Sequence, residues 1–130
     1  MSNRAMGSQG EKRLAEMLSA RGWWVHLLQQ NAAGQPCDII AVDSEGRGYL
    51  IDSKVCSRGR FDLERIEPNQ ESVAIKWGKI TGRQLWFALW VNEYEVFMVS
   101  YGMLMIEKRK FSSLPESRIR EIGIPFGAWV

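Results

Sequence analysis

The chain has 130 residues, of which 45% are hydrophobic and 25% charged. That length and composition are typical of one globular domain with its own core, here spanning residues 1–130, and exclude a disordered or fibrous chain. Lys and Arg number 17 against 15 Asp and Glu, and the resulting net charge of +2 is too small to indicate a nucleic-acid partner by itself.

Two cysteines and one histidine are too few soft ligands for a zinc site. Cys37 and Cys56 do not form a C-x-x-C pair, and we expect free thiols in a reducing cytoplasm. The first ten residues lack a signal-peptide pattern, and the longest apolar run, Leu85–Val91, is far shorter than the roughly 20 residues that span a bilayer. We therefore expect a cytoplasmic protein that does not contact a membrane.

The first predicted element is a helix over Ser8–Ala20, where apolar residues recur at helical spacing. Ser8 followed by Glu11 fits a capping box, and Gly22 is placed to end the helix. Trp23–Leu28 then has the aromatic and branched residues of a strand.

A hairpin is predicted next. A polar loop over residues 31–35 leads to a strand over Asp38–Val42, and the turn at Ser44–Gly48 leads to a second strand over Tyr49–Val55. Cys56–Asp62 is predicted to be a basic loop.

The second half contains further regular elements. The pattern predicts a helix over Pro68–Lys79, strands over Gln84–Val91 and Glu95–Val99, a short helix over Leu114–Ile122, and an irregular but packed tail over Gly123–Val130. Residues 102–108 match no single pattern. This order of helices and strands predicts an α/β fold with a central mixed sheet and helices on its faces.

Three charged residues of the predicted hairpin suggest an active site. Asp38 opens an apolar strand, and Asp52 and Lys54 lie inside the next one. Because strand side chains alternate, Asp52 and Lys54 project from the same face, and the hairpin can bring Asp38 close to them. Two adjacent carboxylates repel one another unless a cation lies between them. Mg²⁺ or Mn²⁺ suits these oxygen ligands, with the backbone carbonyl of Ser53 as a further donor.

Such a site suits phosphodiester hydrolysis, with Lys54 orienting the attacking water or stabilising the developing negative charge. The alternative is that Asp52 and Lys54 are a solvated pair on an edge strand and that Asp38 is an ordinary residue at the start of a strand. A D-x-K tripeptide alone would not decide between them. An acid followed by a short hairpin and D-x-K in an apolar strand is more specific.

These residues resemble the motif of the PD-(D/E)xK nuclease superfamily, and within it the Holliday-junction resolvases of the archaeal and Gram-positive bacterial kinds. The similarity runs from Arg4 to about Gln70. The stretch Arg4-x-x-Gly7-x-x-x-Glu11 resembles the N-terminal motif, whose acid joins the metal site. The remaining matches are Asp38 to the first core acid, Asp52 and Lys54 to the second acid and the lysine, and Gln70 to a glutamine that faces the active site.

The resemblance implies a restriction-endonuclease-like fold, a Mg²⁺-dependent endodeoxyribonuclease and a bacterial, archaeal or phage origin. Two residues depart from the family's usual pattern. Cys37 separates Pro36 from Asp38, where the family usually has proline directly before the acid. Asp52 stands where glutamate is commoner. Neither departure removes a charge from the expected site. Glu11 has the alternative of capping its own helix, and Gln70 that of an ordinary residue on the helix surface.

DNA, and branched DNA in particular, is the expected substrate. Four basic residues are candidate phosphate contacts: Arg4, Arg58, Arg60 and Lys76. A resolvase cuts two strands symmetrically, so we also expect a homodimer. The alternatives are a restriction-, repair- or phage replication-repair-type nuclease of the same fold, and a DNA-binding module without activity.

Overall fold

The computed structural model describes residues 3–29 and 35–130, and their side chains from Met6 on. Its regular elements are, in chain order, α1 (Asn3–Ala20), β1 (Trp24–Leu27), β2 (Ile39–Val42), β3 (Gly48–Val55), β4 (Arg60–Asp62), η1 (Leu63–Arg65), α2 (Pro68–Thr81), β5 (Trp86–Trp90), β6 (Val96–Ser100), α3 (Tyr101–Lys108), β7 (Ser113–Pro115), α4 (Glu116–Ile122), β8 (Ile124–Pro125) and η2 (Phe126–Ala128).

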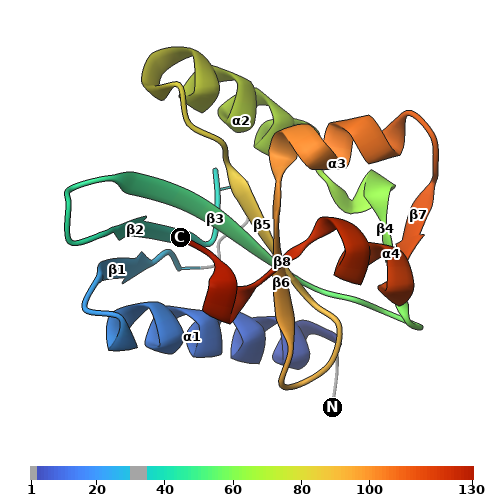
Figure 1. Cartoon of the computed structure of the whole chain (residues 1–130), viewed down its shortest axis with the longest axis horizontal. Helices are drawn as coiled ribbons and strands as arrows, with labels where there is room; N and C mark the ends of the chain where they lie inside the picture. The colour runs from blue at the N-terminus through green and yellow to red at the C-terminus, as the bar shows by residue number, and fades with distance from the viewer. Residues whose placement is uncertain (1–2, 30–34) are drawn as a thin grey trace.

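A six-stranded sheet in the order β1-β2-β3-β5-β6-β8 forms the centre of the molecule. β3 and β5 pair in parallel, whereas the other neighbours are antiparallel. Helix α1 covers one face of this sheet, and α2 and α3 lie on the other (Figure 1). The predicted mixed sheet with helices on its faces is therefore confirmed.

The predicted hairpin is also confirmed, with Ile39 opposite Ile51 and Val42 opposite Gly48. Strand β3 is buried on both of its faces because helices cover both sides of the sheet. Tyr49 and Ile51 belong to the core beneath α1, and Leu50 belongs to the core on the α2 side. By the same alternation, Asp52 and Lys54 share the face of Leu50.

The predicted start of the first helix was wrong. Helix α1 begins at Asn3, so Ser8 lies inside it and does not cap it. Arg4, Ala5 and Met6 are good helix formers, so the helix continues through them past the local cap signal. A capping box is instead present at α2, between Glu67 and Gln70.

The segments after β3 also differ in part from the prediction. The basic loop contains β4, which pairs with β7, and the last predicted helix begins at Glu116 because Ser113–Pro115 form that strand. Strands of three residues are too short to show a periodicity. Residues 102–108, which matched no single pattern, belong to helix α3.

The tail is packed as predicted, with Trp129 only 1% exposed, but the prediction that it is irregular was wrong, because it contains β8, which pairs with β6, and η2. Its ring contacts those of Trp23, Tyr49 and Trp86. Both cysteines are free. In the described part of the chain, no helix combines the length and apolar character needed to cross a membrane. The predicted loop at residues 31–34 lies outside the described residues.

Candidate active site

A polar cleft of about 650 Å³ opens at the end of the β2–β3 hairpin that lies opposite its turn. Strands β2 and β3 supply the acids, α1 one wall and the start of α2 another. Its lining residues are Met6, Gly7, Glu11, Gln35, Asp38, Asp52, Ser53, Lys54, Val55, Cys56, Ser57, Arg58, Arg65, Glu67 and Gln70.

Asp38 lies at the point where the chain enters β2, and it is 7% exposed. Its Oδ2 accepts a hydrogen bond from the backbone N–H of Ser53 at 2.8 Å, and its Oδ1 accepts one from Nε2 of Gln35 at 3.3 Å. The Asp38 carboxylate therefore continues the hairpin ladder one step beyond the last paired residues. This contact fixes it beside the segment Asp52–Lys54.

Asp52 is 2% exposed and lies on the floor of the cleft. Nζ of Lys54 lies 3.3 Å from Oδ2 of Asp52, which is an ion-pair distance. That oxygen nevertheless accepts no hydrogen bond from the described residues. Because an ionised carboxylate can accept several hydrogen bonds, a buried oxygen of this kind has capacity for another ligand.

Burial and the neighbouring Asp38 carboxylate together raise the pKa of Asp52 far above its ordinary value, and Lys54 opposes the change without cancelling it. The Cys37 thiol is affected in the same way. Burial, then Asp52 and Asp38, raise its pKa to about 12, so the thiol stays protonated. The cleft is thus a place where negative charge accumulates without sufficient compensation from protein groups.

The backbone of β3 contributes to the cleft as well. The carbonyl of Ile51 accepts from the N–H of Asp38, and the N–H of Ser53 donates to the side chain of Asp38, so both point toward the β2 side. Strand β2 starts opposite Ile51, and the edge of β3 beyond that point is open. The carbonyl of Ser53 points to this open edge, while its hydroxyl accepts a hydrogen bond from Nε1 of Trp90 on the α1 side.

A hard divalent cation suits these donors. Among the described residues, no group of three His, Cys, Asp or Glu side chains lies close enough together to hold a metal ion. Mg²⁺ commonly uses one or two carboxylates, with water and substrate oxygens completing its octahedron. Asp38, Asp52 and the carbonyl of Ser53 are suitable protein donors of this kind, and the Oδ2 of Asp52, which accepts no hydrogen bond from the described residues, fits a bound cation.

Glu11 and Gln70 lie on the walls of the same cleft, 8% and 5% exposed respectively. The side-chain oxygen of Gln70 accepts from the N–H of Glu67 at 3.0 Å, so this residue caps α2 while it faces the site. Glu11 reaches the cleft from α1, but it does not complete a three-carboxylate cluster. Its part in metal binding stays a prediction.

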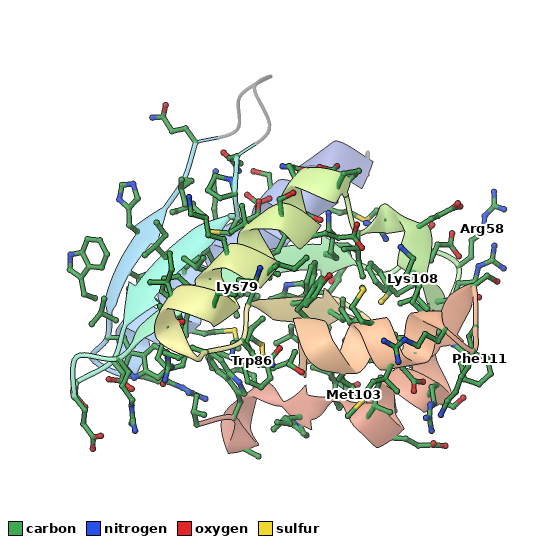
Figure 2. All side chains as sticks on the ribbon, turned by 90° about the horizontal axis from the view of Figure 1, so that it is seen from above. Arg58, Lys79, Trp86, Met103, Lys108 and Phe111 are labelled. Carbon is green, nitrogen blue, oxygen red and sulfur yellow. The ribbon has the colours of Figure 1, made fainter. Side chains whose placement is uncertain are left out.

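The four residues predicted to contact phosphate do not all lie at the cleft. Arg58 lines the cleft and projects from the tip of the loop before β4 (Figure 2). Arg60 is outside the cleft lining and pairs with Asp62 at 3.2 Å. Lys76 is exposed on α2, also outside the lining. The side chain of Arg4 lies outside the described residues.

Several lining residues were not singled out from the sequence, among them Gln35, Glu67 and Arg65. Gln35 holds Asp38, Glu67 begins α2, and Arg65 reaches the cleft from η1. The position of Gln35, three residues before Asp38, was a usable local signal. No local sequence signal pointed to Arg65, because it lies near the end of β3 only through the pairing of β4 with β7 and the turn that follows β4.

Comparisons with known proteins bear on the fold. No family model matches the sequence, and no curated protein matches it. Among solved structures, the chain is similar to Archaeoglobus fulgidus Hjc, a Holliday junction resolvase from an archaeal hyperthermophile. The TM-score is 0.67 at 16% identity, over 92% of this chain and 95% of that one. The chain has a restriction-endonuclease-like fold. At this identity the similarity establishes the fold and leaves the activity to be argued from the site.

Proposed function

We propose that this chain is a metal-dependent DNA endonuclease of the PD-(D/E)xK type that acts on branched DNA. The observation that carries the proposal is the buried Asp52 carboxylate beside Asp38 in an open polar cleft, whose Oδ2 lies at ion-pair distance from Lys54 but accepts no hydrogen bond from the described residues. A purely structural carboxylate at 2% exposure would have its hydrogen bonds completed by the protein. The fold shared with Hjc, itself a Holliday junction resolvase, supports branched DNA as the substrate.

Each residue has a definite proposed part. Asp38, Asp52 and the carbonyl of Ser53 hold Mg²⁺ or Mn²⁺, which when bound withdraws charge from the phosphate and lowers the pKa of water. The ammonium of Lys54 orients the attacking water and neutralises negative charge that develops on the phosphate oxygens. Water attacks phosphorus, the bond to the leaving oxygen breaks, and the cleaved strand has one new phosphate end and one new hydroxyl end.

A homodimer forms part of this proposal, because symmetric cutting of a junction requires two sites related by a two-fold axis. The second half of the chain exposes apolar side chains that suit such an interface. On α3 and just after it, Met103, Ile106 and Phe111 are 36%, 48% and 47% exposed, and Figure 2 shows Met103 and Phe111 along the same side of the molecule. Analytical ultracentrifugation tests this part separately.

The function is tested by incubating the purified protein with labelled four-way junction, flap, single-stranded and linear duplex DNA, in Mg²⁺, Mn²⁺ or EDTA. Asp52→Asn removes the charge of the proposed ligand while keeping its shape. The matched control is Asp43→Asn, which changes another buried aspartate of the same hairpin outside the cleft.

Paired metal-dependent nicks in the junction alone, lost in Asp52→Asn, would establish a resolvase. Metal-dependent cutting of the other substrates would retain the nuclease and favour a repair or restriction role. If no substrate is cut and metal binds equally to wild type and Asp52→Asn, the catalytic proposal is overturned in favour of a DNA-binding module.

A further inference from the structure

Arg65 is held rigidly on the wall of the cleft. Its Nη1 donates to the carbonyl of Val55 at 2.8 Å, and its guanidinium lies over the Phe61 ring, 5.3 Å from the centroid. Within the described part of the chain, Arg65 takes part in no ion pair and no other hydrogen bond. Some arginines are neutralised by carboxylates, as in the pairs of Arg47 with Asp43 and Arg118 with Glu107.

The carbonyl that anchors Arg65 belongs to the same open edge of β3 as the proposed metal site. Backbone groups of alternate strand residues point to the same side, so the carbonyls of Ser53 and Val55 both face the edge that β2 leaves open. Two residues along a strand span about 7 Å. The Arg65 guanidinium is therefore anchored two residues, or about 7 Å, along β3 from the carbonyl of Ser53.

We propose that Arg65 binds a backbone phosphate of the DNA, next to the phosphate at which the strand is cut. The inference rests on the proposed nuclease function and adds a substrate contact to the same cleft. A guanidinium has five N–H donors in a planar fork, and the Val55 carbonyl uses one nitrogen. Arg65 lines the cleft, and no carboxylate of the described residues forms an ion pair with it. Because the anchors already restrict the side chain, binding a phosphate loses little conformational entropy.

A structural role is the competing explanation, since Arg65 also satisfies a carbonyl at the end of β3. Arg83 provides a matched control for that role. Its Nε donates to the carbonyl of Gly48 at 2.8 Å, and its guanidinium lies over the Tyr49 ring at 4.5 Å. Arg83 is thus held by the same two kinds of contact, a backbone carbonyl and an aromatic ring, but at the opposite end of β3 and outside the cleft lining.

The experiment measures binding of a fluorescently labelled four-way junction and a linear duplex by anisotropy in EDTA, where cleavage is prevented, from 50 to 200 mM salt. The proteins are wild type, Arg65→Gln, Arg65→Lys and Arg83→Gln. Each phosphate contact contributes close to one unit to the slope of log affinity against log salt. Arg65→Gln should therefore bind more weakly with a slope smaller by about one, and its deficit should shrink about threefold over this salt range.

Arg83→Gln should match wild type in slope and affinity, and Arg65→Lys should restore most of the slope because the charge returns. Thermal melts identify any variant that is unfolded. If Arg65→Gln is unfolded, the DNA affinity of Arg65→Lys is the deciding measurement instead. A wild-type slope in folded Arg65→Gln overturns the inference while leaving the nuclease intact. Wild-type protein that neither binds nor cuts DNA overturns the proposed function as well.

Discussion

The two ends of the β2–β3 hairpin each bury an aspartate, but the surroundings of the two carboxylates are opposite. At the turn, Asp43 is 8% exposed and accepts hydrogen bonds from the N–H groups of Glu45 and Arg47, from Nε of Arg47 and from the hydroxyl of Tyr49. At the open end, Asp52 has a buried oxygen without a hydrogen bond.

The pKa shifts follow from this difference. Burial alone would raise the pKa of Asp43, but its hydrogen bonds, led by Arg47, hold it well below the ordinary value. Burial and Asp38 raise the pKa of Asp52 instead. Burial of an acid therefore does not identify a functional site. The distinguishing feature is whether the protein itself completes the bonds of the buried charge.

The strongest test of this contrast replaces each acid by its amide. Asp52→Asn should lower cleavage by about 100-fold or more, since it removes several kcal/mol of metal-linked stabilisation of the transition state. Asp43→Asn should leave kcat close to the wild-type value but lower Tm, because an amide cannot pair with Arg47 as the carboxylate does. Single-turnover cleavage and thermal melts measure the two effects. Loss of cleavage in folded Asp43→Asn would break the comparison.

The pH dependence of stability should also separate the two acids. Because the folded pKa of Asp52 is raised above its ordinary value of 3.8, its contribution to stability is fully present below pH 3.8 and is lost as pH rises through the folded pKa. The folded pKa of Asp43 is lowered, so its contribution is present above the ordinary value and is lost as pH falls.

Urea unfolding in EDTA between pH 3 and 9 measures this dependence. Asp52→Asn should be more stable than wild type near pH 9 and should lack most of the decline on the alkaline side. Asp43→Asn should lack part of the decline on the acidic side. A decline of unchanged size in Asp52→Asn would show that another group causes it.

Added metal should bind only at the open end of the hairpin, where Asp52 lies. A ligand that binds the folded state at 100 times its Kd stabilises it by about 2.7 kcal/mol, so Mg²⁺ or Mn²⁺ should raise the Tm of wild type by several degrees at pH 8. Asp43→Asn should keep this increase and Asp52→Asn should lose it. Calorimetry with and without EDTA provides the measurement. Equal shifts in all three proteins would place the cation elsewhere.

The smallest expected effect concerns Arg58, at the tip of the loop beside the cleft. Arg58 and Gly59 have φ values of 56° and 72° in a two-residue turn, an arrangement that favours Asn-Gly. Arg58→Asn should therefore stabilise the protein by roughly 0.5–1 kcal/mol while lowering the salt slope of DNA binding by about one. Arg58→Lys keeps the charge and controls for it. A stabilised variant with unchanged DNA binding would mean that Arg58 does not contact phosphate.

Much of the catalytic hairpin was predictable because its determinants are local. An apolar alternating strand, a Gly-containing turn and a second apolar strand specify an antiparallel pair, and a period of two then places Asp52 and Lys54 on one face. Pro68 likewise marked the start of α2. In contrast, the cap expected at Ser8 was wrong because the residues before it are good helix formers and α1 continues through them.

The sequence by itself determined the α/β class, the hairpin and the proximity of its charged residues, since each depends on residues close together in the chain. Tertiary structure alone decided that β5 lies parallel to β3, that Asp52 has a buried oxygen without a hydrogen bond from the described residues, and that Arg65 lies beside the cleft. These features depend on segments that meet only after folding. Whether a buried charge is satisfied is a property of all its neighbours together, and no local pattern records it.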